Sequence, residues 1–480
     1  MAAVAVDERE DDRLAVAGDA PEGPVEVAPS ADEPPPRMAR RVLSLAWPVI
    51  TQNLLETLVG VVDTFLVAGL GAVALAGVGA GLQVTFFLLA ALSALSIGAS
   101  IIVAHAVGAG DRAEAGRLAK QTLVWSAIGS VPLSLGGALA VEQIMRLFGV
   151  APDVAAIGAG YLRVTMTMFP FMLLVFALSA VLRGAGDTRT PLRAGLLANV
   201  INGVLAYGLI YGNLGLPNLG AVGSGWAAAL GRMGAAVMLV LVLLRGRGGL
   251  SLRGRDNWLP QLGVARRILG LGVPAALEQT LISAAFTTLT VVIATLGTQA
   301  LATQRIIFNA LSVAFLPGIG FSIAAATLVG QSLGARRPRE GTAAANAAAG
   351  WAVLWMGFTG LLFFIFARQI VGAFSDDPAV LDLGTTALRV MALQQPLWGM
   401  LFVWSGAIRG TGNTRYPLIA NATSIWLAVG IGFLGVMAFD FSLPALWALF
   451  IPSSALNGLA NWLRFRRNDW YAKSLAARSR

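Results

Sequence analysis

The sequence predicts an all-α polytopic membrane protein with twelve transmembrane helices in two pseudo-symmetric six-helix lobes. Its composition, the placement of its basic residues and an internal repeat all predict this fold. Of the 480 residues, 56% are hydrophobic and 12% are charged, and the mean hydropathy is +0.73. A soluble chain carries about a quarter of charged residues, so this composition favours a lipid environment.

Twelve apolar segments follow one another along the chain. Each is close to the ~20 residues that a helix needs to cross a bilayer. Their approximate limits are 43–68, 75–105, 118–140, 158–182, 191–212, 220–244, 268–295, 301–332, 344–366, 384–408, 416–438 and 443–463.

The basic residues alternate between the two sides of this predicted membrane. Arginine and lysine gather before the first segment, in every second loop and after the last segment, whereas the loops between hold only Arg146 and Arg368. By the positive-inside rule, both termini lie in the cytoplasm and the protein lies in the cell membrane. The net charge of +9 therefore reflects membrane topology, and we expect no nucleic acid partner.

The chain repeats itself at a fixed offset. Pro48 returns as Pro274 and the loop Leu182–Pro191 returns as Ile408–Pro417, each 226 positions later. Each copy holds six segments, an even number, so both copies insert with the same orientation. The pseudo-twofold axis then lies along the membrane normal, an arrangement typical of alternating access around a site between two lobes.

The repeat also sets the domain boundaries. We assign 37–245 to the first lobe, 246–265 to a cytoplasmic linker and 266–465 to the second lobe. Residues 1–36 are acidic and rich in proline, which predicts a disordered cytoplasmic tail, and 466–480 form a basic cytoplasmic tail.

Side-chain chemistry excludes several classes of function. The chain has no cysteine and one histidine, which rules out thiolate metal sites, cysteine nucleophiles and an HExxH motif. A polytopic membrane enzyme is therefore a remote alternative, and we expect no enzymatic activity and no cofactor. His105 aligns with Gln331 at the cytoplasmic end of its segment, where we expect a polar cap.

Asp63 lies inside the first apolar segment. An ionised carboxylate costs several kcal/mol in lipid, so Asp63 must face a cavity, a partner or a proton. Glu56 and Gln52 precede Asp63 by two and three helical turns and lie on about the same face. This stripe predicts a water-accessible cavity wall. The alternative for Asp63 is a structural acid bonded to a neighbouring helix, and the alternative for the stripe is a single functional acid beside residues that only form hydrogen bonds.

Asn199 and Asn202 lie three residues apart on one face of segment 191–212. Asn202 and Asp63 could offer oxygen ligands to sodium, a hard cation that prefers oxygen. Hydrogen bonds between helices are the alternative role. Arg232 lies deep in its segment and requires a counter-charge, which we expect to be an acid of the first lobe.

The second lobe offers a different set of candidates. Glu278 is its single membrane acid and aligns with Gln52. It is either a cation-binding carboxylate or an interfacial glutamate wetted from the cytoplasm. We expect Gln304 and Asn309 to line a cavity between the lobes. Met172 and Trp398 offer the soft apolar surface that promiscuous binding sites use, unless they pack or face lipid.

Five motifs, taken in order, resemble the multidrug and toxic compound extrusion (MATE) family. They are Pro48-x3-Gln52…Val62-Asp63-Thr64-Phe65, the loop Leu182–Pro191, Asn199-x2-Asn202…Tyr207–Gly212…Pro217-x-Leu219-Gly220-x2-Gly223, Gln304-x4-Asn309…Pro317-Gly318-x-Gly320…Gly330-x2-Leu333-Gly334, and the repeated loop Ile408–Pro417. The resemblance runs from about residue 38 to 465.

This resemblance implies a V-shaped two-lobe antiporter that expels amphipathic, often cationic compounds in exchange for protons or sodium. It places cation coupling on Asp63 and matches the family's asparagine at Asn202. Two positions depart from the family. Where some members carry an aspartate four residues after the asparagine, this chain has Ala206. The family's second-lobe acid corresponds to Ile282, one helical turn after Glu278.

The sequence therefore predicts a monomeric, cation-coupled antiporter that exports amphipathic organic compounds by alternating access, with protons or sodium as the coupling ion. The alternative is a lipid-linked saccharide flippase of the same superfamily, whose members have a strongly cationic cavity and extra helices. At the 226-residue offset Asp63 faces Leu289 and Asn202 faces Ala428. We therefore expect the polar chemistry in the first lobe and mainly substrate surface in the second.

Overall fold

The computed structural model describes residues 35–246, 250–253 and 256–467, and the side chains of all of these except 35–36, 86–87 and 89–92. The predicted tails, 1–36 and 466–480, lie almost entirely outside the described residues, and part of the predicted linker 246–265 does so too. Within the described part, all regular secondary structure is helical, as the sequence predicts.

Fifteen helices are described. They are α1 (Pro35–Ala68), α2 (Ala72–Gly108), α3 (Arg112–Leu139), α4 (Val141–Leu147), α5 (Pro152–Thr167), α6 (Phe169–Gly184), α7 (Arg189–Tyr211), α8 (Ala221–Leu244), α9 (Leu262–Ala294), α10 (Thr298–Gly334), α11 (Pro338–Ile365), α12 (Ala367–Gly372), α13 (Pro378–Gly410), α14 (Arg415–Phe439) and α15 (Leu443–Arg466).

The apolar helices confirm a multi-pass membrane fold. Among the described residues, nine helices are long and apolar enough to cross a membrane, or ten if α5 and α6 form one bent span. Each of the twelve predicted segments overlaps a helix or the α5–α6 pair. The two beyond the ten are α2, which counts as two shorter apolar stretches (Ala72–Thr85 and Ser93–Gly108), and α13. The number twelve therefore stays a prediction.

The predicted span 158–182 is broken in the structure. The axes of α5 and α6 meet at an angle of 54°. Pro170 lies in the first turn of α6 and has no N–H to continue the hydrogen bonds of α5, which accounts for the break. Its counterpart in the repeat, Pro396, lies within α13, which runs unbroken from Pro378 to Gly410.

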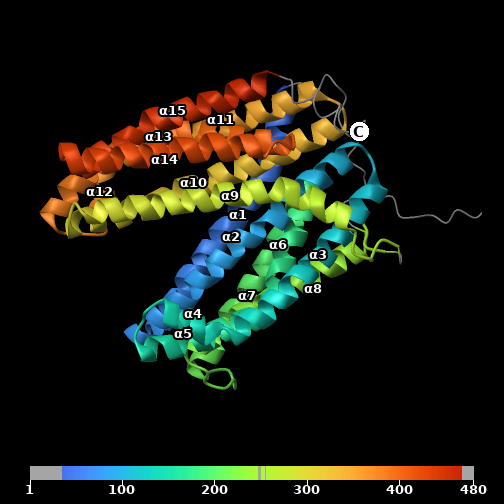
Figure 1. Ribbon diagram of the computed structural model, residues 1–480, viewed down its shortest axis with the longest axis horizontal. Coiled ribbons are helices and arrows are strands. Elements are labelled where there is room, and N and C mark those ends of the chain that lie inside the picture. Colours follow the sequence, from blue (N-terminus) through green and yellow to red (C-terminus); the bar gives the residue numbers. More distant parts are fainter. Residues whose placement is uncertain (1–34, 247–249, 254–255, 468–480) are drawn as a thin grey trace, which may run out of the picture.

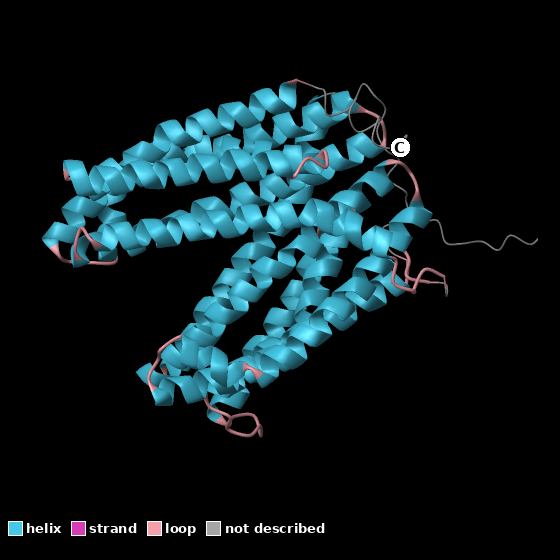
Figure 2. Cartoon of the chain, viewed as in Figure 1, coloured by secondary structure: helices cyan, strands magenta, loops and turns pink. Residues whose placement is uncertain are grey.

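Figure 1 shows the helices in two diverging groups, with α9–α15 in one and α3–α8 in the other. The groups lie close together where the ends of α2 and α10 cross. They are spread apart at the end that carries α4 and α12. Figure 2 shows that short loops connect most of the helices.

The first helix of each copy packs against both groups. Met38, Val42 and Ala46 at the start of α1 are buried in an apolar cluster with residues of α10, α11 and α13. In the same way, Val264 and Ile268 at the start of α9 are buried among residues of α2, α3, α6 and α8. The two groups are therefore joined by the first halves of α1 and α9.

Small residues allow the backbones to approach closely at this joint. A Cβ atom on Gly272 of α9 would overlap the backbone of Ala94 on α2, and one on Gly320 of α10 would collide with Ile50 and crowd Ala46 on α1. These two contacts are equivalent in the repeat, since Gly272 aligns with Ala46 and Gly320 with Ala94. Small residues at helix crossings in membranes serve this purpose.

The described part of the linker is held against α3. The buried Lys120 donates to the carbonyl oxygen of Arg253 at 2.9 Å, and Gln121 donates to that of Leu259 at 2.7 Å. Arg117 donates to the side chain of Gln261 at 2.6 Å. These bonds fix the chain just before α9 begins, four residues earlier than the predicted second lobe.

We predict that Gly272→Ala lowers the thermal stability of the protein. The added methyl group has no room beside Ala94, and overpacking typically costs about 1–3 kcal/mol. Gly270→Ala is the matched control, because a Cβ atom there meets open space. Removing a helix-interior glycine should stabilise α9 by ~0.5–1 kcal/mol. Melting curves of the detergent-solubilised variants should shift in opposite directions; equal shifts would contradict the close approach.

Candidate functional site

Asp63 and Asn202 meet between α1 and α7. The amide nitrogen Nδ2 of Asn202 donates to Oδ2 of Asp63 at 2.9 Å. Asn202 is 5% exposed and Asp63 is half-buried. Both residues lie well inside continuous helices, so their side chains are held by the packing of α1 on α7. The sequence prediction that these two residues form one site is consistent with this contact.

The pair retains free hydrogen-bonding capacity. Oδ1 of Asp63 and Oδ1 of Asn202 are both buried and have no hydrogen-bond partner among the described residues. The side-chain nitrogen Nδ2 of Asn199, one turn before Asn202, is also buried without a partner. One unpartnered carboxylate oxygen and one unpartnered amide oxygen suit a proton or a small hard cation, because both bind to oxygen.

Two further residues complete the charge environment of Asp63. The guanidinium of Arg232, on α8, lies within electrostatic reach of the Asp63 carboxylate, an acid of the first lobe, but the described residues show no salt bridge between the two. The charges of Arg232 and Asp63 both act on Tyr161 of α5, whose side chain is buried. Sequence reasoning missed Tyr161; a tyrosine hydroxyl within an apolar segment was the available signal.

Gln52 and Glu56 form a separate contact on α1. The amide of Gln52 donates to Oε1 of Glu56 at 3.0 Å, and Glu56 is exposed. The charge of Glu56 acts on Arg183 at the end of α6. The structure therefore brings Gln52 to Glu56 and Asp63 to Asn202, and the described side chains show no hydrogen bond between the two pairs.

Glu278 lies at the centre of a polar network in the second copy. The carboxylate is 2% exposed and accepts a hydrogen bond of 2.6 Å from Asn421 of α14. Arg409 of α13 lies 3.4 Å from it. The amide oxygen of Asn421 accepts a 3.0 Å bond from Asn457 of α15, which in turn accepts one from Asn461 at 2.8 Å. Glu278 is thus buried, and this burial does not fit the alternative role of an interfacial glutamate wetted from the cytoplasm.

This network corrects the expectation that the polar chemistry is concentrated in the first copy. Comparing the carboxylates at the repeat offset reveals one acid in the second lobe, but not its partners, which are the guanidinium of Arg409 and the amide of Asn421 on other helices. Asn421 aligns with Gly195, which lies beside Gln52. The asparagines of α14 and α15 were visible as polar residues in apolar segments, which is the signal that would have found them.

Three of the predicted cavity residues are packed in the interior. Gln304 is buried and accepts a 3.0 Å hydrogen bond from the indole of Trp447. Trp398 donates to Ser454 at 3.0 Å, and its ring contacts Phe315. Met172 is 2% exposed in an apolar cluster. Among Gln304, Trp398, Met172 and Asn309, the exposed residue is Asn309. Dense packing around the other three explains the difference from the predicted cavity wall.

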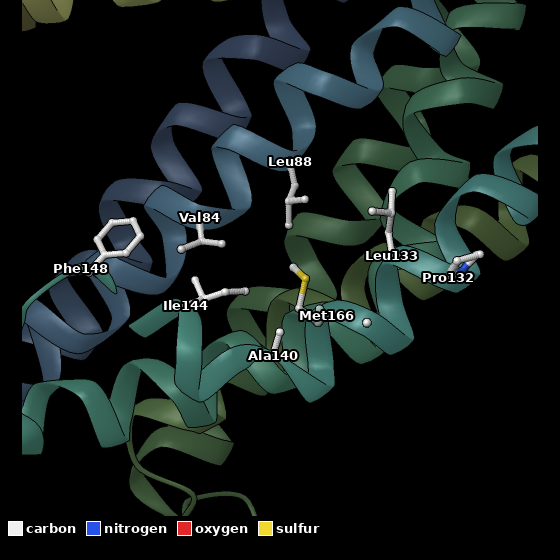
Figure 3. Close-up of a pocket in the computed structure, with 10 residues that line it drawn as sticks. Val84, Leu88, Pro132, Leu133, Ala140, Ile144, Phe148 and Met166 are labelled. Carbon is white, nitrogen blue, oxygen red and sulfur yellow. The ribbon is translucent and has the colours of Figure 1, made fainter. Parts of the chain in front are cut away.

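A cavity of about 490 Å³ lies elsewhere in the first copy. Figure 3 shows Val84 and Leu88 of α2, Leu133 of α3, Ile144 of α4 and Met166 of α5 around it. Its lining is apolar and includes none of the predicted site residues. Nor do the described residues bring together three histidine or acidic side chains that could hold a metal ion.

Comparison with known proteins agrees with the repeat. The MatE family model matches the chain twice, over residues 48–208 and 274–434. These matches cover more than half of the chain, and their limits are 226 positions apart. The chain belongs to the MatE family.

Relatives match nearly the whole MatE chain. It is 29% identical over 448 residues to the probable multidrug resistance protein NorM of Thermotoga maritima, with 93% of this chain and 96% of that one covered. It is 31% identical over 412 residues to the multidrug resistance protein NorM of Burkholderia vietnamiensis, with 83% and 87% covered.

A solved structure confirms the shared MatE fold. It is described as the outward-facing conformation of a multidrug resistance MATE family transporter of the MOP superfamily. The TM-score is 0.83 at 23% identity, and the match covers 91% of this chain and 97% of that one. The chain is therefore a multi-pass membrane protein of a transporter family.

We predict that Glu278→Ala destabilises this MatE protein strongly. The change leaves Arg409 and Asn421 without the carboxylate, and breaking a buried ion pair costs about 3–5 kcal/mol. The side chain of Arg409 is 24% exposed, so we expect a value near the lower limit. Glu142→Ala is the control, because its 3.0 Å pair with Arg163 is well exposed and worth about 0–1 kcal/mol. Equal melting temperatures of the two variants would contradict the expected contribution of the network to stability.

Proposed function

We propose that this protein is a cation-coupled antiporter that exports amphipathic, cationic organic compounds by alternating access. The named relatives support drug export, since both are called multidrug resistance proteins. The proposed architecture is twelve spans in two six-helix lobes, in which α2 and α13 complete the ten candidate spans. The double match to one family model supports the pseudo-symmetry of the two lobes.

The single observation that carries cation coupling is the pair of unpartnered oxygens at Asp63 and Asn202. A proton on Oδ1 of Asp63, or a sodium ion between the two oxygens, would remove this unsatisfied polarity. Either ion would also compensate a carboxylate that is costly inside the membrane. Asn199 lies near enough on α7 to offer its amide to the same site.

Helix α1 offers a route from this site to the other lobe. Asp63 lies in its second half, against α7, while Met38 and Val42 in its first half are buried against the second copy. Pro48 lies between them and lacks an N–H, which weakens the helix at that point. We propose that ion binding at Asp63 bends or repositions α1 near Pro48. The difference in ion affinity between two conformations then drives export.

We propose that the substrate path lies between the two lobes and that Asn309, which is exposed, contributes to it. Gln52 and Glu56 offer polar contacts to a cationic substrate, whereas Gln304, Met172, Trp398 and Glu278 support the helices that surround the path. We propose that the protein acts as a monomer in the cell membrane, with both termini in the cytoplasm. Arg409 is paired with Glu278 and the charge of Arg232 acts on Asp63, which does not favour the cationic cavity of a lipid-linked saccharide flippase.

We predict that Asp63→Asn lowers gradient-driven export at least tenfold. The amide has the size of the carboxylate but carries no charge and binds no proton at neutral pH. Export of a fluorescent organic cation from proteoliposomes measures this loss. Asp153→Asn is the matched control, because Asp153 is exposed in the first turn of α5 and should leave export unchanged. Full export by the Asp63→Asn variant would contradict coupling at this site.

The coupling ion can be identified by imposing a proton gradient and a sodium gradient separately. We expect one of the two to drive export and the Asp63→Asn variant to lose the response. If sodium is the ion, Asn202→Ala removes one ligand, and the sodium concentration for half-maximal export should rise about tenfold, which corresponds to ~1.4 kcal/mol. Export that neither gradient accelerates would refute the antiport mechanism.

A further inference from the structure

Among the polar contacts between the two copies, two hydrogen bonds join the ends of α2 and α10 to the ends of α13 and α6. The imidazole Nε2 of His105, on α2, lies 2.8 Å from the carbonyl oxygen of Gly410 at the end of α13. The amide Nε2 of Gln331, on α10, donates to the carbonyl oxygen of Gly184 at the end of α6, at 3.0 Å. Each bond thus joins a side chain of one copy to the backbone of the other.

The two bonds are equivalent in the repeat. His105 aligns with Gln331 and Gly184 aligns with Gly410, each 226 positions apart. Different side chains therefore make the same contact in both copies. The accepting carbonyls belong to the last residues of α6 and α13, where the helix itself supplies no N–H partner. Each side chain acts as a cap for a helix of the other copy.

The surrounding backbone is shaped to admit these side chains. A Cβ atom on Gly412 would lie 3.6 Å from the ring of His105, and one on Gly186 would lie 3.1 Å from the amide of Gln331. Gly186 and Gly412 are themselves equivalent and have φ values of 90° and 86°, a conformation that favours glycine. The same construction at both sites argues against a chance contact.

The helices that carry these side chains also cross closely. A Cβ atom on Gly108 of α2 would overlap the backbone of Gln331, and one on Gly334 of α10 would overlap the backbone of His105. This crossing is at the end of the molecule where the groups lie together, opposite the spread end with α4 and α12 (Figure 1). It is also the end that the basic loops predict to be cytoplasmic.

We propose that His105 and Gln331 form a two-part latch that closes the cytoplasmic side of the transporter. The latch consists of the bonds from His105 to Gly410 and from Gln331 to Gly184. Both bonds break when the lobes separate at this side to expose the path to the cytoplasm, and both form again when the path opens outward. The latch rests on the proposed alternating access, and it makes His105 and Gln331 gating residues that touch neither ion nor substrate.

The test measures the distance between the lobes directly. The chain has no cysteine, so spin labels can be attached at Ala113→Cys and Arg339→Cys without further changes. These exposed positions are equivalent and lie at the starts of α3 and α11, near the latch. Pulsed electron paramagnetic resonance in nanodiscs then gives the distribution of distances across the cytoplasmic side.

We predict that His105→Ala with Gln331→Ala shifts this distribution toward longer distances. A net hydrogen bond changes an equilibrium constant by about threefold to tenfold, so losing two should enrich the cytoplasm-open state about tenfold or more. His105→Gln is the matched control, because it installs the side chain that already makes this bond in the other copy. That variant should keep the wild-type distribution.

A wild-type distribution in the double alanine variant would overturn the latch. If that variant does not fold, Gln331→Ala alone and His105→Gln serve as the test, and equal distributions in those two variants would overturn it. The measurement requires no transport, so it is independent of coupling at Asp63. A shifted distribution together with full export by Asp63→Asn would retain the latch and refute the proposed coupling. An unchanged distribution together with lost export by Asp63→Asn would refute the latch and retain the coupling.

Discussion

The close crossing of α1 with α10 and of α2 with α9 is the constraint on which the rest of the structure depends. The helix backbones can approach there because Gly272 and Gly320 lack side chains. The two groups of helices are therefore pinned together at one end, and they diverge toward the other. The space between the groups, the burial of the first half of α1 and the contact of His105 with Gly410 all follow from this joint.

Polar groups inside the membrane are satisfied differently in the two copies. In the second copy, Glu278 is compensated by Arg409 and Asn421, which give both of its carboxylate oxygens a partner within the protein. In the first copy, Asp63 has one bond to Asn202 and a buried oxygen without a partner. A saturated carboxylate stabilises one structure, whereas an unsaturated one can respond to an added ion. This difference is why we assign cation coupling to Asp63 and a structural role to Glu278.

Much of the fold could be predicted from the sequence, because a bilayer imposes helix length and the repeat imposes order. The contact of Asp63 with Asn202 is also in line with the sequence analysis, since polar residues inside apolar segments require partners. The break at Pro170 could not be predicted from the sequence, because the equivalent Pro396 lies within an unbroken helix. The network around Glu278 was missed because it depends on which faces of α14 and α15 turn inward, and apolar segments carry too little periodicity to show this. Packing around Trp398 was hidden for the same reason.

In the proposed mechanism, symmetry and asymmetry serve different steps. The residues at the crossing obey the repeat closely: His105 and Gln331 make equivalent bonds, and the glycines beside them are equivalent too. The acids do not obey it, since Asp63 aligns with Leu289. A hinge between two lobes needs matched surfaces, because both copies must separate and rejoin at the same place. The proposed ion coupling needs no equivalent residues in the two copies. One ion site can shift the equilibrium between the two conformations if its helix contacts both lobes. Helix α1 meets that condition, with Asp63 against α7 and Met38 in the core of the second copy.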